Sequence, residues 1–242
     1  MKKIILLLLS IFALNVTGMY TQELTKEEQN EQAMKREAAE EVAKKAEKER
    51  SYQAKKQARR EAQFTKFVEM VNNYKPTTHD TKNIAELDTF VKHLDSLMVD
   101  VIELFEAYQS VEMVSEPYVG EDGVTDTLWY ARDKATQKRF SNEEAEKLLK
   151  SQRNTVRLYN FKAVALVAEA VLAGKAVATA PGMSVMDKIA LGLDATALLN
   201  QAELIKYGLT SMNYHLKKNM EYLGFQLDNE GDDTTEAELD KF

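Results

Sequence analysis

Residues 191–223 read LGLDATALLNQAELIKYGLTSMNYHLKKNMEYL, and this stretch decides the fold. Its apolar side chains recur at alternating intervals of four and three residues for more than four heptads. That spacing places them on one side of an α-helix, where a facing helix must bury them. The stretch predicts a long helix that Ser184 caps and Gly224 ends, with this stripe: Leu191, Ala195, Leu198, Ala202, Ile205, Leu209, Met212, Leu216, Met220 and Leu223.

Two more helices are predicted upstream, each with its own start signal. One begins near Asp80 or Thr81, and the other begins at a capping box made by Ser141 and Glu144 and ends at residues 181–182. Nine glycines and three prolines leave few chain breakers, which favours long helices. We therefore predict a mainly all-α fold, an antiparallel long-helix bundle over residues 63–227. The apolar positions are Leu87, Val91, Leu94, Met98, Val101, Phe105 and Tyr108 in the first of these helices, and Leu148, Leu149, Val156, Tyr159 and Ala163 in the second.

An extended, charged helix is predicted before the bundle. Thr25 and Glu28 have the spacing of a capping box, and nothing breaks the helix from Lys26 to the sequence NNYKP at residues 72–76. Charged residues and a narrow alanine stripe dominate its first part, so residues 19–62 form a coiled-coil-like arm. The arm is either a solvated single helix or a thin seam that binds a partner. From Phe64 the apolar stripe thickens, and we expect the helix to join the core there.

A small β-hairpin or ordered loop is predicted as an insertion over residues 114–140. This segment contains turn-forming residues and the only tryptophan of the chain. Residues 127–132 and 137–140 are candidate strands around a turn at residues 133–136. Because tryptophan and tyrosine anchor many interfaces, its aromatic residues are the candidate partner-binding patch, with a plug for the end of the bundle as the alternative role of Trp129. These residues are Tyr118, Trp129, Tyr130 and Phe140.

The two ends of the chain are expected to lie outside the bundle. Residues 1–18, MKKIILLLLSIFALNVTG, have the basic start, apolar run and small residues of a cleaved secretory signal peptide. The apolar run has about 11 residues, whereas a membrane span needs about 20. The chain contains no cysteine for a lipid anchor, so the mature protein is expected in the periplasm or outside the cell. Residues 228–242 form an acidic tail that we expect to be disordered.

Residues 163–199 are apolar enough to raise the question of membrane entry. Glu169 and Lys175 lie inside the first helix of this pair, and each costs about 2.5–3.5 kcal/mol at the centre of a membrane span. A constitutive span after signal cleavage is therefore not expected. The segment is either the tight end of a soluble helix pair or a hairpin that is released into a membrane.

The residues that carry chemistry follow no catalytic pattern. The spacing of the histidines His79, His93 and His215 is not that of metal ligands. The sequence around Gly231 does not fit the spacing of a calcium-binding loop. There is no phosphate-binding glycine loop and no nucleophile elbow. A net charge of −7 argues against nucleic-acid binding. We therefore expect a protein that is not an enzyme and that has no cofactor and no metal.

The remaining function classes are structural or interactive. Export, disulfide-free helices and a long arm resemble the layout of helical pilus-tip subunits in conjugative type IV secretion systems. That resemblance implies a periplasmic component of a conjugative transfer apparatus, in contact with other envelope or secretion proteins and able to self-associate through its helices. The export signal, long helices and alanine-rich apolar hairpin also resemble helical pore-forming toxins. A secreted pore-forming protein that uses residues 163–199 is therefore the alternative.

Overall fold

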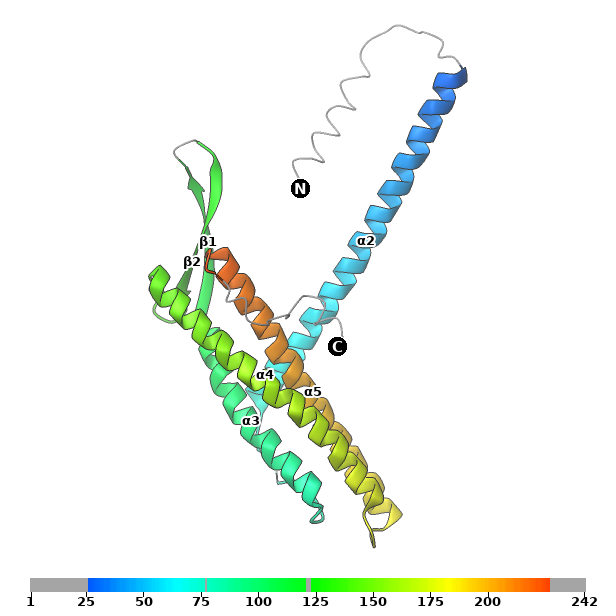
Figure 1. Ribbon diagram of the computed structural model, residues 1–242, viewed down its shortest axis with the longest axis vertical. Coiled ribbons are helices and arrows are strands. Elements are labelled where there is room, and N and C mark those ends of the chain that lie inside the picture. The colour runs from blue at the N-terminus through cyan, green and yellow to red at the C-terminus, as the bar shows by residue number, and fades with distance from the viewer. Residues whose placement is uncertain (1–25, 77, 121–122, 227–242) are drawn as a thin grey trace. The chain divides into compact units, whose positions relative to one another are not determined.

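The computed structural model describes residues 26–76, 78–120 and 123–226, with the backbone alone over residues 26–33 (Figure 1). It confirms a mainly helical protein with a small antiparallel hairpin. The predicted signal peptide, the Thr25 cap and the acidic tail lie outside the described residues. Between Lys55 and Lys56 the chain divides into two units. The elements are α2 (Lys26–Asn73), α3 (Ala85–Gln109), β1 (Val111–Val119), β2 (Thr125–Asp133), α4 (Asn142–Thr179) and α5 (Val185–Tyr222).

The core of the second unit lies between α3, α4 and α5, which run side by side (Figure 1). The stripe predicted for α5 is buried from Leu191 to Met220, as the spacing requires, and Leu223 is half-buried. The stripe of α3 is wider than the predicted seam. Its additional buried residues are Phe90, Leu97 and Leu104.

The start of α3 differs from the prediction. The helix begins at Ala85, because Lys82 and Asn83 have φ angles of 52° and 58° and therefore cannot continue a right-handed helix. The Ile84 N–H closes the turn by donating to the Thr81 carbonyl at 3.1 Å. The residues after Asp80 thus form a turn from Thr81 to Ile84 that leads into the helix.

The predicted caps of α4 and α5 are confirmed. Ser141 and Glu144 form a reciprocal capping box, in which the Ser141 side chain accepts from the Glu144 N–H. Ser184 accepts from the Asp187 N–H at 3.1 Å at the start of α5. The turn between the two helices contains Gly182 with a φ of 72°, a conformation that glycine adopts without strain. These local signals fix where the antiparallel α4–α5 pair begins and ends.

The last turns of α2 join the core by contacting α5. The Phe67 ring is fully buried and lies directly on Gly208. The Tyr207 hydroxyl donates to the Arg60 carbonyl at 2.9 Å. The end of α2 covers this part of α5, so polar side chains of α5 are buried there as well. They are Thr210, Ser211 and Asn213.

The predicted pairing of the β-hairpin is wrong in one respect. Residues 127–132 do form a strand, but their partner is β1, with Val111 opposite Asp133 and Val119 opposite Thr125. Residues 137–140 contribute only the isolated bridge between Arg132 and Arg139. The upstream segment offers nine paired residues, a much longer ladder than four residues after the turn could form.

Candidate interaction surfaces

The base of the β-hairpin is fixed to the helices by its inner face. Ala131 is buried, and the Trp129 ring stacks on Tyr222 near the end of α5 with 4.6 Å between centroids and 12° between planes. Stacked pairs of this kind contribute about 0.5–1.5 kcal/mol beyond the area they bury. Trp129 therefore attaches the hairpin to α5.

The four predicted partner-binding residues do not form one patch. Side chains alternate across a sheet, so Trp129 faces one side while Tyr130 and Tyr118, which are opposite Val114 and Asp126 in the register, face the other. Phe140 lies beyond β2, where its N–H donates to the Ala131 carbonyl at 3.0 Å and its side chain is half-buried. The sequence placed these aromatics in one segment but could not assign their faces, because the register was not known.

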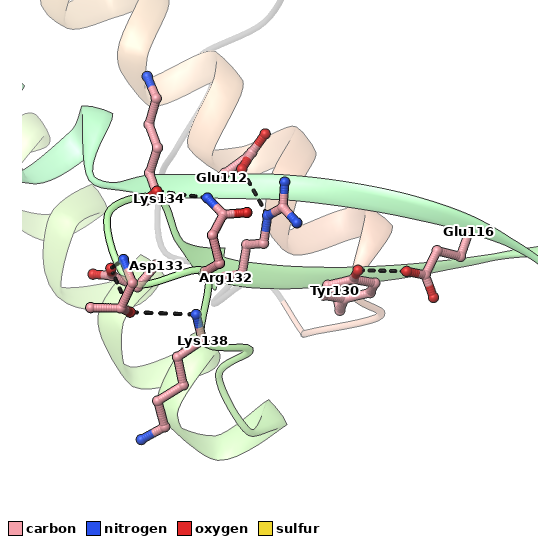
Figure 2. A network of polar contacts seen from close by, with 9 residues as sticks. Glu112, Glu116, Tyr130, Arg132, Asp133, Lys134 and Lys138 are labelled. Carbon is pink, nitrogen blue, oxygen red and sulfur yellow. Dashed lines mark hydrogen bonds and ion pairs between the residues drawn. The ribbon is translucent and has the colours of Figure 1, made fainter.

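A polar network covers the outer face of the hairpin (Figure 2). Arg132 donates to Glu112 across the two strands at 2.8 Å, and this bond lowers the pKa of the Glu112 carboxyl and raises the pKa of Arg132. The Tyr130 hydroxyl donates to Glu116 at 2.6 Å, which raises the pKa of Tyr130. The Arg139 guanidinium lies 4.3 Å from the centre of the Tyr130 ring. Cross-strand pairs of this type fix the register of the two strands.

A tight turn after β2 stiffens the same base. The Asp133 carboxylate accepts from the Thr136 N–H at 2.7 Å and from its hydroxyl at 2.8 Å (Figure 2). These bonds to the charged form lower the pKa of Asp133. The turn predicted at residues 133–136 is thus present, although it leads to a bridge and not to a second strand.

The outer end of the β-hairpin exposes apolar side chains. Because a bundle of this size gains no stability from them, this tip is a candidate recognition element. Glu116 and Asp126 lie on the same part of the hairpin, so its surface combines apolar and acidic groups. The exposed apolar residues are Tyr118, Val119, Val124 and Leu128, at 42–62% exposure.

The arm is the second candidate surface. Every side chain of residues 34–55 is exposed. Glu40 pairs with Lys44 at 2.7 Å and Glu41 with Lys45 at 2.9 Å, which are the favourable i,i+4 pairs that the sequence predicts. The three large apolar side chains in this segment are Met34, Val42 and Tyr52, at 61–68% exposure.

A cleft between α3 and α4 contains two pairs of ionisable side chains that join the two helices. Its volume is about 280 Å³, and it contains His93 and Glu169 with 2.8 Å between Nδ1 and Oε2, and Lys162 donates to Asp100 at 3.1 Å. Local sequence patterns do not predict the pair of His93 and Glu169, because 76 residues separate the partners. Within the described part of the chain, no cluster of three acidic or histidine side chains could hold a metal ion.

Three further polar side chains lie away from this cleft, namely two half-buried tyrosines and one buried glutamine. Burial raises the pKa of the Tyr108 hydroxyl to about 12, and burial together with the Asp95 carboxylate raises that of Tyr74, which donates to Asp95. Gln152 is buried and donates to the Ala107 carbonyl at 2.7 Å. The raised pKa values keep both tyrosine hydroxyls protonated at neutral pH, and the Gln152 bond links α4 to the end of α3.

The fold and its surfaces define a class, a mainly helical bundle with the long helix α2 and a docked β-hairpin. In comparisons with protein-family models, curated proteins and solved structures, no match to this chain was found. No helix in the described residues combines the length and hydropathy that crossing a bilayer requires. The exposed surfaces of this molecule are therefore the features from which its function is inferred.

Proposed function

We propose that this protein is an exported interaction subunit of a bacterial cell-envelope assembly, and that it acts through contacts between helices. In its most concrete form, it is a periplasmic component of a conjugative transfer apparatus, with other envelope or secretion proteins as its partners. The proposal assigns the chain no reaction and no cofactor. The observation that carries it is the arm, in which every side chain of residues 34–55 is exposed.

The physical argument begins with the cost of an uncovered helix. Without tertiary packing, a helix depends on i,i+4 pairs, each worth a few tenths of a kcal/mol. At 100° per residue, Met34 and Tyr52 point in the same direction and Val42 points about 80° away. Three large apolar side chains on one side of a charged helix form a narrow seam. That seam fits a partner helix with a matching apolar stripe.

The partner side of the proposal is tested by capture from the native envelope. The tagged chain is crosslinked mildly in its own cell envelope, purified and analysed by mass spectrometry. We expect secretion or conjugation proteins with the wild-type chain. The triple variant Met34→Glu, Val42→Glu and Tyr52→Glu should lose them.

A matched control adds the same charges to the opposite side of the arm. Ala43→Glu, Ser51→Glu and Ala54→Glu lie about 180–260° around the helix from Met34, at least 100° from each residue of the seam, and should retain the partners. Recovery of the wild-type chain alone, or equal capture by both triple variants, would contradict a role for this seam.

The export part of the proposal has its own test. N-terminal sequencing of the protein recovered from the periplasm or the medium should begin at Met19, directly after Gly18. A chain that retains Met1 and stays in the cytoplasm would contradict it. This outcome is independent of the capture experiment, because a purified arm could still bind its partner.

A secreted pore-forming protein is the second candidate, and one observation favours it. Residues 163–199 expose large apolar side chains, among them Met186 at 75% and Leu193 at 68%. Against it, Glu169, Lys175, Asp187 and Asp194 would have to enter the bilayer with them. Dye release from lipid vesicles over a range of pH tests this candidate. Intact vesicles at every pH would exclude it.

A further inference from the structure

The two strands of the β-hairpin bond to each other through every second residue. At one end of the ladder Lys134 donates to the Ser110 carbonyl at 2.8 Å, and at the other end Gly120 donates to the Val124 carbonyl at 2.9 Å. Both bonds follow the register of the strands, in which the even-numbered residues of β1 exchange backbone bonds with β2. The odd-numbered residues of both strands therefore point their N–H and C=O groups outward, toward the edges of the sheet.

The outer edge of β2 is largely closed by the chain itself. Ala131 and Asp133 form bonds of 3.0 and 2.9 Å with residues 138–140, which follow the strand. Closer to the tip, the Thr127 N–H donates to the Asp126 carboxylate at 2.7 Å. Folded proteins block strand edges because an open edge pairs with other chains. A further strand therefore has little to bind on this side of the hairpin.

The outer edge of β1 is open in its middle part. Ser115 is exposed and Met113 is half-buried. Within the part of the chain that the structure describes, nothing bonds to the outward backbone groups of these two residues. Pro117 has no N–H, so it ends this edge toward the tip. Two N–H and two C=O groups therefore remain for one additional strand.

A cavity of about 330 Å³ adjoins the same part of β1. Val111 and Met113 line it on the strand side, and most of its other walls come from α3, α4 and α5. Leu149 and Leu216 make part of these walls apolar. Gln152, another wall residue, is 6% exposed, and its Oε1 atom has no hydrogen-bond partner among the described residues. Buried polar atoms are nearly always bonded, so this oxygen suits a donor on an incoming side chain.

The charges on the outer face of β1 favour a cationic partner. The Glu112 carboxylate pairs with Arg132 at 2.8 Å, whereas Glu116 bonds to the uncharged Tyr130 hydroxyl (Figure 2). Opposite charges attract across neighbouring strands, and like charges repel. On an added strand, the residue opposite Glu116 is therefore expected to be lysine or arginine.

A second copy of this chain is a poor occupant of the open edge. Two β1 strands pair antiparallel through all four groups when Met113 of each copy bonds to Ser115 of the other. That register places Glu116 of each copy opposite Glu112 of the other, which is a carboxylate and not a cation. Each copy also has a net charge of −7. A cationic segment of a different protein avoids both sources of repulsion.

We propose that β1 binds an extended segment of a partner protein as a third, antiparallel strand of the hairpin. Backbone bonds to Met113 and Ser115 hold the segment, and a lysine or arginine lies opposite Glu116. Three residues further along, a tyrosine or tryptophan lies opposite Met113, where its ring enters the cavity and its donor bonds to Gln152. Strand addition takes affinity from the main chain and specificity from pockets for alternate side chains. The proposal uses no residue of the arm, so it does not rest on the proposed function.

The first test selects random seven-residue peptides, displayed on phage, against the full chain. Enriched peptides should share a lysine or arginine three residues before a tyrosine or tryptophan. Ser115→Pro removes one outward donor and leaves a peptide carbonyl unpaired, so it should weaken binding by roughly 10-fold or more. Thr125→Pro makes the same change at an outward N–H of β2 and should leave binding unchanged. Absence of enrichment, or equal binding to Ser115→Pro, would overturn the proposal.

The hairpin should still form in the Ser115→Pro variant. Pro117 already occupies the same kind of position in β1, with its nitrogen turned away from β2. The stacking of Trp129 on Tyr222 provides the check, because Trp129 emission should be the same in both proline variants as in the wild type.

A second test changes the peptide and not the protein. N-methylation of its tyrosine or tryptophan blocks an N–H that faces Met113 and should weaken binding by roughly 10-fold. N-methylation of the preceding residue, whose N–H points away from β1, should have little effect. Equal effects of the two modifications would contradict strand addition.

Amide hydrogen exchange measured by NMR locates the bound strand. In the free chain the N–H groups of Met113 and Ser115 should exchange rapidly, whereas that of Val114, which faces β2, should exchange slowly. The selected peptide should slow exchange at Met113 and Ser115 by roughly 10-fold or more and leave Thr125 unchanged. Slow exchange of Met113 and Ser115 in the free chain would show an edge that is already covered, and this would overturn the proposal. None of these results depends on capture from the envelope, so this proposal and the proposed function can fail separately.

Discussion

The contact between Phe67 and Gly208 is the point at which α2 joins α5, and it makes a quantitative prediction. A Cβ atom at position 208 would lie 2.2 Å from Cδ2, 2.3 Å from Cγ and 2.4 Å from Cε2 of the Phe67 ring. Ordinary contacts begin at 3.4 Å, so the ring would have to move by 3.4 − 2.2 = 1.2 Å or more. It has no free space, because Phe64 and Phe105 lie at 5.8 and 5.6 Å between ring centroids.

Two opposing terms set the expected effect of Gly208→Ala. Replacing a helical glycine by alanine gains about 1 kcal/mol, whereas overpacking a filled core costs about 1–3 kcal/mol. The clash here is with the body of a buried ring, so we take the upper value. The variant should lose about 2 kcal/mol of stability, or about 4–8 °C in Tm. Urea unfolding followed by circular dichroism measures this directly.

A control within the same helix isolates the cause. Gly192 has no atom within 4 Å of the position of an added Cβ, so Gly192→Ala should gain about 1 kcal/mol from helix propensity alone. Removing the ring should reverse the sign at Gly208. In a Phe67→Ala background, which itself costs about 3–5 kcal/mol, Gly208→Ala should stabilise the protein. If Gly208→Ala stabilises the wild-type chain as Gly192→Ala does, Phe67 does not lie on Gly208 and the reasoning is refuted.

Three further predictions concern the β-hairpin and the helix caps. Tyr222→Ala should shift the emission of Trp129 to longer wavelength and cost about 1 kcal/mol, whereas a hairpin that is not attached to α5 would give no shift. Ser184→Ala should cost about 1 kcal/mol in urea unfolding through loss of the cap, while Ser151→Ala, exposed in the middle of α4, should cost nothing measurable. Hydrogen bonds lower the pKa of Glu112 and of Asp133 in the folded state. A carboxyl with a lowered folded-state pKa stabilises the fold at pH values above its unfolded-state pKa. This stabilisation is lost as the pH falls through the folded-state pKa. We therefore expect Trp129 emission to report loosening of the hairpin below about pH 4, with a weaker pH dependence in Glu112→Gln; an unchanged dependence would exclude the Glu112–Arg132 bond as its cause.

The helix pair α4–α5 could be predicted from the sequence because its signals are local. The capping residues Ser141 and Ser184 lie within three residues of their partners, and the α5 stripe repeats at a fixed helical interval. Each signal also agrees with the next, since the caps open the same helices that the stripes define. Such consistency is the usual condition for a correct prediction from sequence.

The hairpin register could not be predicted in the same way. The segment with Pro117 reads as a loop, yet it pairs with β2 residue by residue, which is possible because a two-stranded sheet has only edge strands. The partner of a strand depends on which pairing buries Ala131 and places Trp129 on Tyr222. That choice is made by tertiary contacts, so the local turn at Asp133 gave the wrong partner.

The polar residues buried on α5 depend on a contact between distant parts of the chain. Tyr207 and Ser211 lie outside the predicted stripe and would face water in a bundle of three helices. The last turns of α2 cover them, and Tyr207 bonds to the Arg60 carbonyl. A helical wheel of α5 contains no information about α2. Gly208 alone is not a sufficient signal of this contact, because Gly192 also lies inside α5 and no other residue approaches it.

Residues 163–199 resemble a membrane segment in composition because both sides of each helix are apolar, and the structure buries one side and exposes the other. Average hydropathy adds the interior alanines to the exterior Val171, Leu172 and Leu193, and so gives one high value. The interior set explains how α4 and α5 pack, since small residues let helices approach closely. The exterior set contributes nothing to that packing. The fold covers the inner surface of this helix pair, and the large outward-pointing side chains remain exposed.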